Sequence, residues 1–534
     1  MRADDQRPAS SGAGPLTVDW VVSKEINADD RLPRTIWVDV EDLFDYAAAN
    51  PRPSGIQRLA FAIYCVLHER LGPRVQFVRH EPSATSFRIV PWQAVSALFD
   101  DLVSPQQQEA ERLLNAVRRL LAGPPLIGRA FSRQNMAGAV RRLPPRVSTQ
   151  LIRFGVLQPV AWRALRDLGR ALIDARRGAG AAPQDLPAAA DGLSTAEVPP
   201  LPPAPAAPAS GADVAAFAAR ARPQDVVLVL GAPWFHRDYG GLLAAVRARH
   251  GIRVALLLYD LIPLRRPEWC DKRLVRQFAS WFAGTIPQCD DLFAISRASA
   301  EDVALYARQH GLRLPGPVRP IPIGTGFSPL ATEPVPVEAP AEEADLALLP
   351  EPGSYVLFVS TVEARKNHVL LFRVWRQLLD DLPADRVPTL VFAGRVGWLV
   401  ADLMQQLENA NYLDGKIVLV RDPTDAELRA LYAGCLFTVF PSLFEGWGLP
   451  VTESLALGRP CVISSCTSLP EAGGSLARYF DPEDTADAYR AIRSVIEDQA
   501  GLAAWTERVR REFQPVGWEA TATAILDGIA EPAR

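Results

Sequence analysis

The stretch FPSLFEGWGLPVTESLALG, residues 440–458, reads as the end of a strand, a tight loop and a helix. The apolar run ends near Pro441, and Glu445–Gly448 form the loop. Pro450 fits the first turn of the helix and Gly458 fits its far end. Glycines let backbone N–H groups approach a ligand closely, and a helix N-terminus offers unpaired donors and partial positive charge to a phosphate. This stretch therefore predicts an anion-binding edge of an α/β sheet.

Two carboxylates flank this helix start. Seven residues separate Glu445, in the loop, from Glu453, about one turn into the helix. Carboxylates accept hydrogen bonds from sugar hydroxyls, so together with the amide donors they suit a sugar linked to a diphosphate. The alternative is a loop charge and a helix-start acid favoured by the helix dipole, and the spacing alone leaves both open.

Two further segments have the same strand-then-loop form. VSTVEARKN (359–367) places Arg365 and Lys366 after a strand, where they could neutralise a diphosphate by charge-assisted hydrogen bonds. The alternative there is a solvated basic pair at a helix start. AGRVGW (393–398) is a Gly-rich loop that means little alone.

The pattern around these segments alternates between short apolar strands and helices, which predicts βα units and parallel sheets. Strands are predicted at 35–40, 75–78, 226–230, 254–259, 292–295, 318–323, 355–359, 389–393, 417–420, 437–440 and 461–464. Helices are predicted at about 54–70, 240–250, 272–286, 298–310, 369–379, 425–433 and 516–529. Ser54 with Gln57 and Thr424 with Glu427 have the spacing of capping boxes. We predict two doubly wound α/β domains whose strand ends face one cleft, where open α/β sheets bind ligands.

The domain limits follow from changes in composition. We predict a disordered lead-in (1–33), an N-terminal domain (34–326) with an insertion at about 104–222, and a Pro-rich hinge (327–352). A C-terminal domain (353–512) and a last helical segment (513–534) that packs back on the first domain complete the chain.

Composition excludes several classes of protein. Of the 534 residues 48% are hydrophobic and 22% charged, with a formal net charge of −4, which argues against a nucleic-acid-binding protein. None of the six cysteines forms a Cys-x-x-Cys pair, which argues against a zinc ribbon and for a reducing compartment. The first fourteen residues lack the apolar core of a signal peptide, and no apolar run approaches the roughly 18 residues of a membrane span. We expect a cytoplasmic protein.

The insertion has an unusual charge. Residues 104–177 contain 14 Arg, no Lys and four acidic residues, a net of about +10, and residues 178–209 are rich in Ala and Pro. Its helical spacing predicts a basic amphipathic surface that could lie on the inner face of an anionic membrane. The alternative is a helical subdomain with a solvated basic face.

These motifs together resemble the retaining, nucleotide-sugar-dependent glycosyltransferases of family 4, which have the GT-B fold. The resemblance covers most of 353–485 and rests on EGWGLPVTE, ARKN, AGRVGW, FTVFPSLFEG and LPEAGG (469–474). A looser resemblance in YDLIPLRRPEW (259–269), AISRASAEDV (294–303) and PSGIQR (53–58) is to the branch that builds bacterial O-antigens and capsules, among them mannosyl- and rhamnosyltransferases.

The resemblance implies roles for individual residues. Glu453 would hold the ribose of the nucleotide, Glu445 would contact the donor sugar near its reacting centre, and Lys366 with Arg365 would bind the diphosphate. Further donor-binding residues implied are Gly446, Gly448, Leu449, Pro450, Val451, Thr361, Gly394 and Arg395. The family uses no metal or other cofactor, because the basic pair and the helix terminus take the place of a divalent cation.

The chain departs from the family pattern at two positions. Many relatives have an Arg where this chain has Thr361, and many have a His-Asp pair where this chain has Tyr259 and Asp260. Asp260 is kept as a candidate catalytic residue, while His236 either takes over the histidine's role or is structural. On the acceptor side the resemblance implies Ser54, Gly55 and Arg58, with a plain helix start as the alternative.

The implied function is transfer of a hexose or deoxyhexose, with mannose from GDP-mannose as the best candidate, to a cell-surface polysaccharide or lipid-linked glycan. The main alternative is an inactive scaffold of this fold. An epimerase or phosphorylase fits less well because those families carry different site residues, and the pyridoxal phosphate lysine motif of phosphorylases is absent from the sequence. No G-x-G-x-x-G follows the first strand of either domain, which argues against a dinucleotide dehydrogenase.

Overall fold

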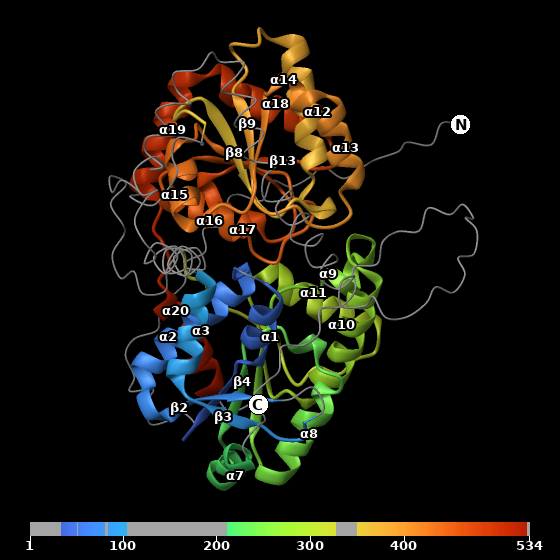
Figure 1. Cartoon of the computed structure of the whole chain (residues 1–534), viewed down its shortest axis with the longest axis vertical. Helices are drawn as coiled ribbons and strands as arrows, with labels where there is room; N and C mark the ends of the chain where they lie inside the picture. Colours follow the sequence, from blue (N-terminus) through green and yellow to red (C-terminus); the bar gives the residue numbers. More distant parts are fainter. Residues whose placement is uncertain (1–33, 51, 81–83, 104–210, 327–349, 531–534) are drawn as a thin grey trace, which may run out of the picture. The chain divides into compact units, whose positions relative to one another are not determined.

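Figure 1 shows the computed structural model, which describes residues 34–50, 52–80, 84–103, 211–326 and 350–530. These residues belong to one compact unit that contains two separate sheets. No helix among them is long and apolar enough to cross a membrane.

The first sheet has seven strands in the order β3-β2-β1-β4-β5-β6-β7. Its strands are β1 (Ile36–Asp39), β2 (Val75–Arg79), β3 (Arg88–Val90), β4 (Val226–Val229), β5 (Arg253–Leu258), β6 (Asp291–Ala294) and β7 (Arg319–Pro320). All pairs are parallel except β2 with β3. The strand order reverses direction at β1, which pairs with both β2 and β4.

The second sheet is parallel throughout, with the order β10-β9-β8-β11-β12-β13. Its strands are β8 (Tyr355–Val359), β9 (Thr389–Ala393), β10 (Ile417–Val420), β11 (Thr438–Phe440), β12 (Cys461–Ser464) and β13 (Arg478–Phe480). The order reverses at β8, so the loops after β8 and β11 lie beside each other at the carboxyl edge.

Helices connect the strands of both sheets. Those of the first half are α1 (Glu41–Ala49), α2 (Gly55–Leu71), α3 (Trp92–Val103), α7 (Gly211–Arg220), α8 (Tyr239–His250), α9 (Ile262–Arg265), α10 (Lys272–Thr285) and α11 (Arg297–Gln309). Those of the second half are α12 (His368–Asp381), α13 (Ala401–Asn409), α14 (Asn411–Asp414), α15 (Asp425–Gly434), α16 (Leu449–Ala456), α17 (Leu469–Gly473), α18 (Thr485–Glu497), α19 (Gln499–Glu512) and α20 (Trp518–Ala530).

The strands are buried on both faces because helices cover both sides of each sheet. In β4 and just beyond it, Val226, Leu228 and Leu230 join one apolar cluster, while Val227 and Val229 join the cluster on the opposite face. This alternation follows from the two-residue period of a strand, and burial on both faces explains the uninterrupted apolar run VVLVL.

Helix α20 packs on the first sheet's domain although it follows the second sheet in sequence. Its residues Trp518 and Ile525 belong to the same apolar cluster as β1 and α2. On the surface of this contact, the Arg70 guanidinium donates to Thr523 Oγ1 at 2.7 Å.

The predicted fold class of two Rossmann-like α/β sheets is confirmed, and the structure corrects details. The strands β3 and β13 were not predicted, and the strand predicted at 318–323 is only Arg319–Pro320. The capping box of Thr424 and Glu427 forms. That of Ser54 and Gln57 does not, because Ser54 Oγ caps α2 by accepting from Ile56 N instead of Gln57 N, and Gln57 Oε1 accepts from Ser54 Oγ instead of Ser54 N.

The lead-in (1–33), the Arg-rich stretch (104–177), the Ala- and Pro-rich stretch (178–209) and residues 327–349 of the predicted hinge (327–352) lie outside the described residues. The domain limits drawn from the sequence stay predictions.

Candidate functional site

The turn after β8 carries the basic pair. It is a 3-10 turn, Ala364–Lys366, followed by Asn367 in the left-handed conformation with a φ of 60°. The buried Asn367 amide donates to Pro441 O at 3.2 Å and to Pro482 O at 3.0 Å, and Leu443 N donates to Arg365 O at 2.9 Å. The turn after β8 is thereby bonded to the loop after β11.

The two cations share one carboxylate. Arg365 Nη1 lies 2.9 Å from Glu445 Oε2, and Lys366 Nζ lies 2.5 Å from Glu445 Oε1. Arg365 Nη1 also donates to Phe444 O at 3.0 Å, and its Nε lies 3.4 Å from Glu363 Oε2. Each oxygen of Glu445 is thus engaged by a different cation.

The neighbouring positive charges keep Glu445 ionised. Burial alone would raise the pKa of Glu445, but the charges of Lys366 and Arg365 outweigh it and hold its pKa at about 2. Burial and the neighbouring Arg365 lower the pKa of Lys366, against the opposing effect of Glu445. Burial raises the pKa of Glu363. An incoming phosphate would therefore meet two cations already held in place by a carboxylate with which it can compete.

The loop Gly446–Gly448 ends at the N-terminus of α16. Gly448 is the N-cap residue, with a φ of 117° and no side-chain cap. A Cβ on Gly448 would lie 2.7 Å from Leu469 Cδ2, so the close packing as well as the φ requires glycine. Ser468 Oγ donates to Glu445 O at 3.0 Å and to Trp447 O at 2.8 Å, which fixes the loop.

The helix start offers fewer donors than the sequence implied. Val451 N donates to Gly448 O at 2.9 Å, and Pro450 has no N–H. Of the stretch Gly448–Val451, the N–H groups of Gly448 and Leu449 remain as donors for an anion.

Glu453 lies one turn into α16 beside Tyr432 of α15. Tyr432 Oη donates to Glu453 Oε2 at 3.1 Å and to Pro450 O at 3.2 Å. Burial raises the pKa of Glu453 to about 7, although the charge of Arg58 and the Tyr432 hydrogen bond act in the opposite direction. The carboxyl group therefore changes its charge near neutral pH.

Thr361, Gly394 and Arg395 lie next to one another where β8 and β9 end. Val362 N donates to Arg395 O at 2.8 Å, and Gly397 N donates to Val362 O at 2.9 Å. A Cβ on Gly394 would lie 2.1 Å from Ser360 O, and its φ is 152°, so no other residue fits there. Arg395 is within 3.4 Å of Asn50 Oδ1 and 3.5 Å of Tyr46 Oη, both on or next to α1.

In the first sheet's domain, Asp260 is the second residue after β5. Its Oδ1 accepts from Ile262 N at 2.9 Å. Burial raises the pKa of Asp260, and the positive charge of Arg365 opposes this shift. A Cβ on Gly446 would lie 2.5 Å from Tyr259 O and 3.3 Å from Asp260 Cβ, so the glycine allows close contact between the loop and Asp260. The candidate residues Glu445, Arg365, Lys366 and Asp260 are therefore neighbours.

Tyr259 does not take over the role of the histidine that many relatives have. Its hydroxyl donates to Leu230 O at 2.6 Å and is buried inside the first domain. His236 accepts from Asp238 N at 2.9 Å through Nδ1, and its ring centroid lies 4.8 Å from that of His80.

The predicted acceptor residues at the start of α2 are in contact with α15 and α16. Arg58 forms a two-pronged ion pair with Asp425, with N–O distances of 2.8 and 2.7 Å. A Cβ on Gly55 would lie 3.5 Å from Leu449 Cδ1. Arg58 is thus already paired with a carboxylate, and Ser54 is engaged as the helix cap.

Sequence reasoning missed Tyr432 and Glu363. Tyr432 belongs to the apolar face of α15, where a tyrosine reads as a core residue. Glu363 stands within the quoted segment VSTVEARKN (359–367) and could have been noticed from its place two residues before Arg365. Among the described residues, no group of three or more His, Cys, Asp or Glu side chains could hold a metal ion.

Residues 342–512 match the family described as Glycosyl transferases group 1, so the region that contains the Glu445 cluster carries this domain. The chain resembles a "Serotype-specific mannosyltransferase WbdA" from Escherichia coli, with 27% identity over 286 residues, 52% of this chain and 34% of the relative. An "O-antigen chain mannosyltransferase B" from Escherichia coli is 32% identical over 173 residues, 32% of this chain and 45% of the relative.

A "D-inositol 3-phosphate glycosyltransferase" from Thermobifida fusca is 31% identical over 196 residues, covering 33% of this chain and 42% of the relative. The chain thus spans less than half the length of each of these relatives. Among solved structures, TarM is similar with a TM-score of 0.41 and 12% identity, covering 57% of this chain and 54% of TarM. A TM-score of this size carries no argument about this chain.

Proposed function

We propose that this protein is a retaining hexosyltransferase that uses a nucleotide sugar and needs no metal ion. The donor we propose is GDP-mannose, and the acceptor a growing cell-surface polysaccharide or lipid-linked glycan. The mannosyltransferase names of two of its relatives and the domain match at 342–512 support this choice.

One observation carries the proposal. Arg365 and Lys366 converge on the two oxygens of Glu445. The loop that carries Glu445 leads into the N-terminus of α16, and Glu453 lies one turn into that helix. Two cations and two free amides suit a diphosphate, while a carboxylate one turn further suits the hydroxyls of a ribose. A free sugar would use only part of this arrangement.

The reaction follows from these positions. The bond from the anomeric carbon to the diphosphate oxygen breaks as the acceptor hydroxyl oxygen attacks on the same face. The hydroxyl proton passes to the leaving diphosphate. Lys366 and Arg365 stabilise the negative charge that develops on the leaving group, and Glu445 orients both cations. Asp260, next to the loop, is placed to accept a hydrogen bond from the sugar or the acceptor.

No metal is required in this scheme, because the two cations and the helix N-terminus supply the positive charge that a divalent ion supplies elsewhere. We therefore expect the protein to transfer the sugar in the presence of EDTA.

The test is equilibrium binding and hydrolysis of UDP-, GDP-, dTDP- and ADP-linked sugars by the purified full chain, with and without EDTA. We expect one base to bind at micromolar to millimolar concentration, independently of EDTA, and Glu453→Ala to weaken that binding. Failure of every donor to bind would overturn the proposal in favour of an inactive scaffold. Binding that requires a divalent ion would overturn its metal-independent part.

We also propose that the protein works in the cytoplasm on the inner face of the membrane, with the Arg-rich insertion as the contact. The net charge of about +10 in residues 104–177 supports attraction to anionic lipid. Sedimentation with vesicles of anionic phospholipid should fall when residues 104–210 are deleted, and unchanged sedimentation would contradict the contact.

A further inference from the structure

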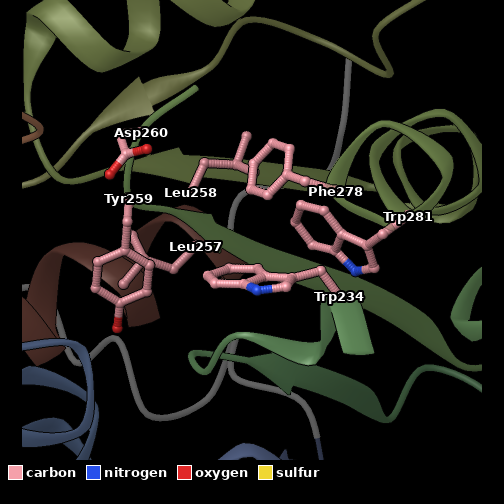
Figure 2. Close-up of a pocket in the computed structure, with 7 residues that line it drawn as sticks. All are labelled: Trp234, Leu257, Leu258, Tyr259, Asp260, Phe278 and Trp281. Carbon is pink, nitrogen blue, oxygen red and sulfur yellow. The ribbon is translucent and has the colours of Figure 1, made fainter. Parts of the chain in front are cut away.

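A small aromatic cavity lies at the carboxyl end of β5, in the first sheet's domain. Figure 2 shows its lining: the last two residues of β5, the two that follow, two rings of α10 and one tryptophan from the turn after β4, namely Leu257, Leu258, Tyr259, Asp260, Phe278, Trp281 and Trp234. In this view Asp260 lies at one end of the group and Trp281 at the other, with Phe278 and Trp234 between them.

The three rings are inclined to one another instead of stacking flat, with Trp234 and Trp281 edge to face and the other two pairs tilted. The ring centroids of Trp234 lie 5.3 Å from Phe278 and 5.7 Å from Trp281, and those of Phe278 and Trp281 lie 5.2 Å apart. These distances are typical of aromatic packing, so the rings form a rigid wall without needing a ligand.

The wall contains unsatisfied donors. Among the described residues, the indole Nε1 of Trp234 and that of Trp281 are both buried without a hydrogen-bond partner, and the Trp281 side chain is only 6% exposed. A buried N–H without an acceptor destabilises the folded protein, and a buried tryptophan usually finds a partner. The cavity therefore favours an occupant that brings an acceptor oxygen.

The size of the cavity limits that occupant. Its volume is about 20 Å³, whereas a single water needs roughly 10–15 Å³ and an apolar cavity that holds a six-membered ring is about 150 Å³ on a comparable measure. A sugar ring cannot enter, but a methyl-sized substituent with one attached oxygen can. The ring of such a sugar would stay outside, on the side of Asp260.

We propose that this cavity takes the acetyl group of an N-acetylated sugar in the acceptor, which deepens and rests on the proposed glycosyl transfer. The methyl group would contact the apolar side chains, and the carbonyl oxygen would accept from an indole N–H. The amide N–H would donate to the Asp260 carboxylate. A 6-deoxy methyl group leaves the indoles unpaired, and a hydroxymethyl group can accept from an indole but brings no methyl group to contact the apolar side chains.

The first experiment measures binding alone, by saturation-transfer NMR on the full chain without donor. The probes are the methyl glycosides of N-acetylglucosamine, N-acetylgalactosamine and N-acetylmannosamine, compared with those of glucose, galactose, mannose and rhamnose. We expect at least one N-acetylated probe to bind, with its acetyl methyl group receiving the strongest saturation, and the others to bind at least fivefold more weakly.

The second experiment removes one donor at a time. Trp281→Phe and Trp234→Phe keep an aromatic ring and delete the indole N–H, so at least one of them should weaken the N-acetylated probe about three- to tenfold. Trp518→Phe is the matched control, because its indole N–H is also buried without a partner but lies outside the cavity lining. The control should leave the affinity unchanged.

The outcomes separate this inference from the proposed function. Equal binding of acetylated and unacetylated probes, or no binding of any N-acetylated probe, overturns the acetyl site even if a nucleotide sugar is still bound and hydrolysed. A selective N-acetyl probe in a protein that binds no nucleotide sugar supports the site and overturns the transferase. If both indole variants are folded, with unchanged thermal unfolding midpoints, and bind the probe as the wild type does, the indoles are not its donors and the proposal fails.

Discussion

Two charged clusters stand at the carboxyl edges of the two sheets, and they are built differently. In the first sheet, Glu41 accepts two hydrogen bonds from Arg79, at 3.0 and 2.6 Å, and one from His80 N at 3.0 Å. Asp39 accepts from Tyr239 Oη at 2.5 Å and from Glu41 N at 3.0 Å. These acids are bonded to backbone amides and to side chains of β2 and α8.

In the second sheet, Glu445 is bonded chiefly to two cations that belong to one short turn. Nothing in that arrangement requires the partner of the cations to be a carboxylate, because phosphate oxygens offer the same geometry. The first cluster joins β1 to β2 and stabilises the fold. The second holds two cations at a loop edge, where a ligand can share or replace their counter-ion. Loss of a residue from the first cluster should therefore lower stability, and loss from the second should lower activity.

The largest effect is expected for Lys366→Ala, which tests whether the second cluster acts in catalysis. We expect turnover to fall about a hundred- to thousandfold, as when one stabilising donor is removed from a developing anion. Steady-state transfer with the identified donor measures it. Lys416→Ala is the control, since Lys416 Nζ donates only to the backbone, to Val387 O at 2.7 Å, and it should keep wild-type turnover. A Lys366→Ala enzyme of normal turnover would remove the second cluster from the mechanism.

The corresponding change in the first cluster is Glu41→Gln, which should affect stability instead of turnover. We expect the free energy of unfolding to fall by about 2 kcal/mol, because Arg79 loses its charged partner in a mostly buried site. Urea unfolding measures it, with the exposed Glu69→Gln on α2 as the control. Turnover per folded molecule should not change. Unchanged stability together with lost activity would reverse the assignment of the two clusters.

A smaller effect is expected for Glu453→Ala. The Michaelis constant for the donor should rise about tenfold while turnover stays within a few-fold, since a hydrogen bond to the ribose contributes to the ground state and the transition state alike. The exposed Glu408→Ala on α13 is the control. A drop in turnover at an unchanged Michaelis constant would place Glu453 at the reacting centre instead.

The smallest effect is on pH dependence. Because the pKa of Glu453 is raised to about 7, this group is largely protonated at pH 6 and ionised at pH 8. Only the ionised form accepts freely from both ribose hydroxyls, so donor affinity should weaken as the pH falls through 7, by at most about tenfold per unit. Calorimetry from pH 5.5 to 8.5 measures it, and Glu453→Gln should flatten the curve. Affinity that strengthens toward low pH would contradict this role.

The sequence predicted the long features of the fold and missed the short ones. Buried strands such as Val226–Val229 are apolar without interruption and could be recognised. The strands β3 and β13 have three residues each, which is too few for a period to be detectable in them. Sheet pairing decides their conformation, and pairing partners are not visible in a local stretch of sequence.

For the site, the sequence located the loops but not their contacts. Glu445 and Arg365 are 80 residues apart, and only the pairing of β8 with β11 brings them together. The motif predicted a carboxylate at the donor sugar and a basic pair at the diphosphate, whereas the structure shows them bonded to each other. Likewise, the ion pair of Arg58 with Asp425 depends on the tertiary structure, which spacing cannot reveal.

The hydrogen bonds of the Asn367 side chain have a consequence for protein engineering. Its amide group joins the turn after β8 to Pro441 and Pro482, and the Arg365 carbonyl accepts from Leu443 N. The turn that carries Arg365 and Lys366 and the loop that carries Glu445 are therefore held together as one unit. This unit is built from three segments that are distant in the sequence. A chimera that imports only the residues around Glu445 from another enzyme would disturb the hydrogen bonds that join this loop to the other two segments. Transplants should instead exchange 360–368, 441–448 and 481–483 as one block.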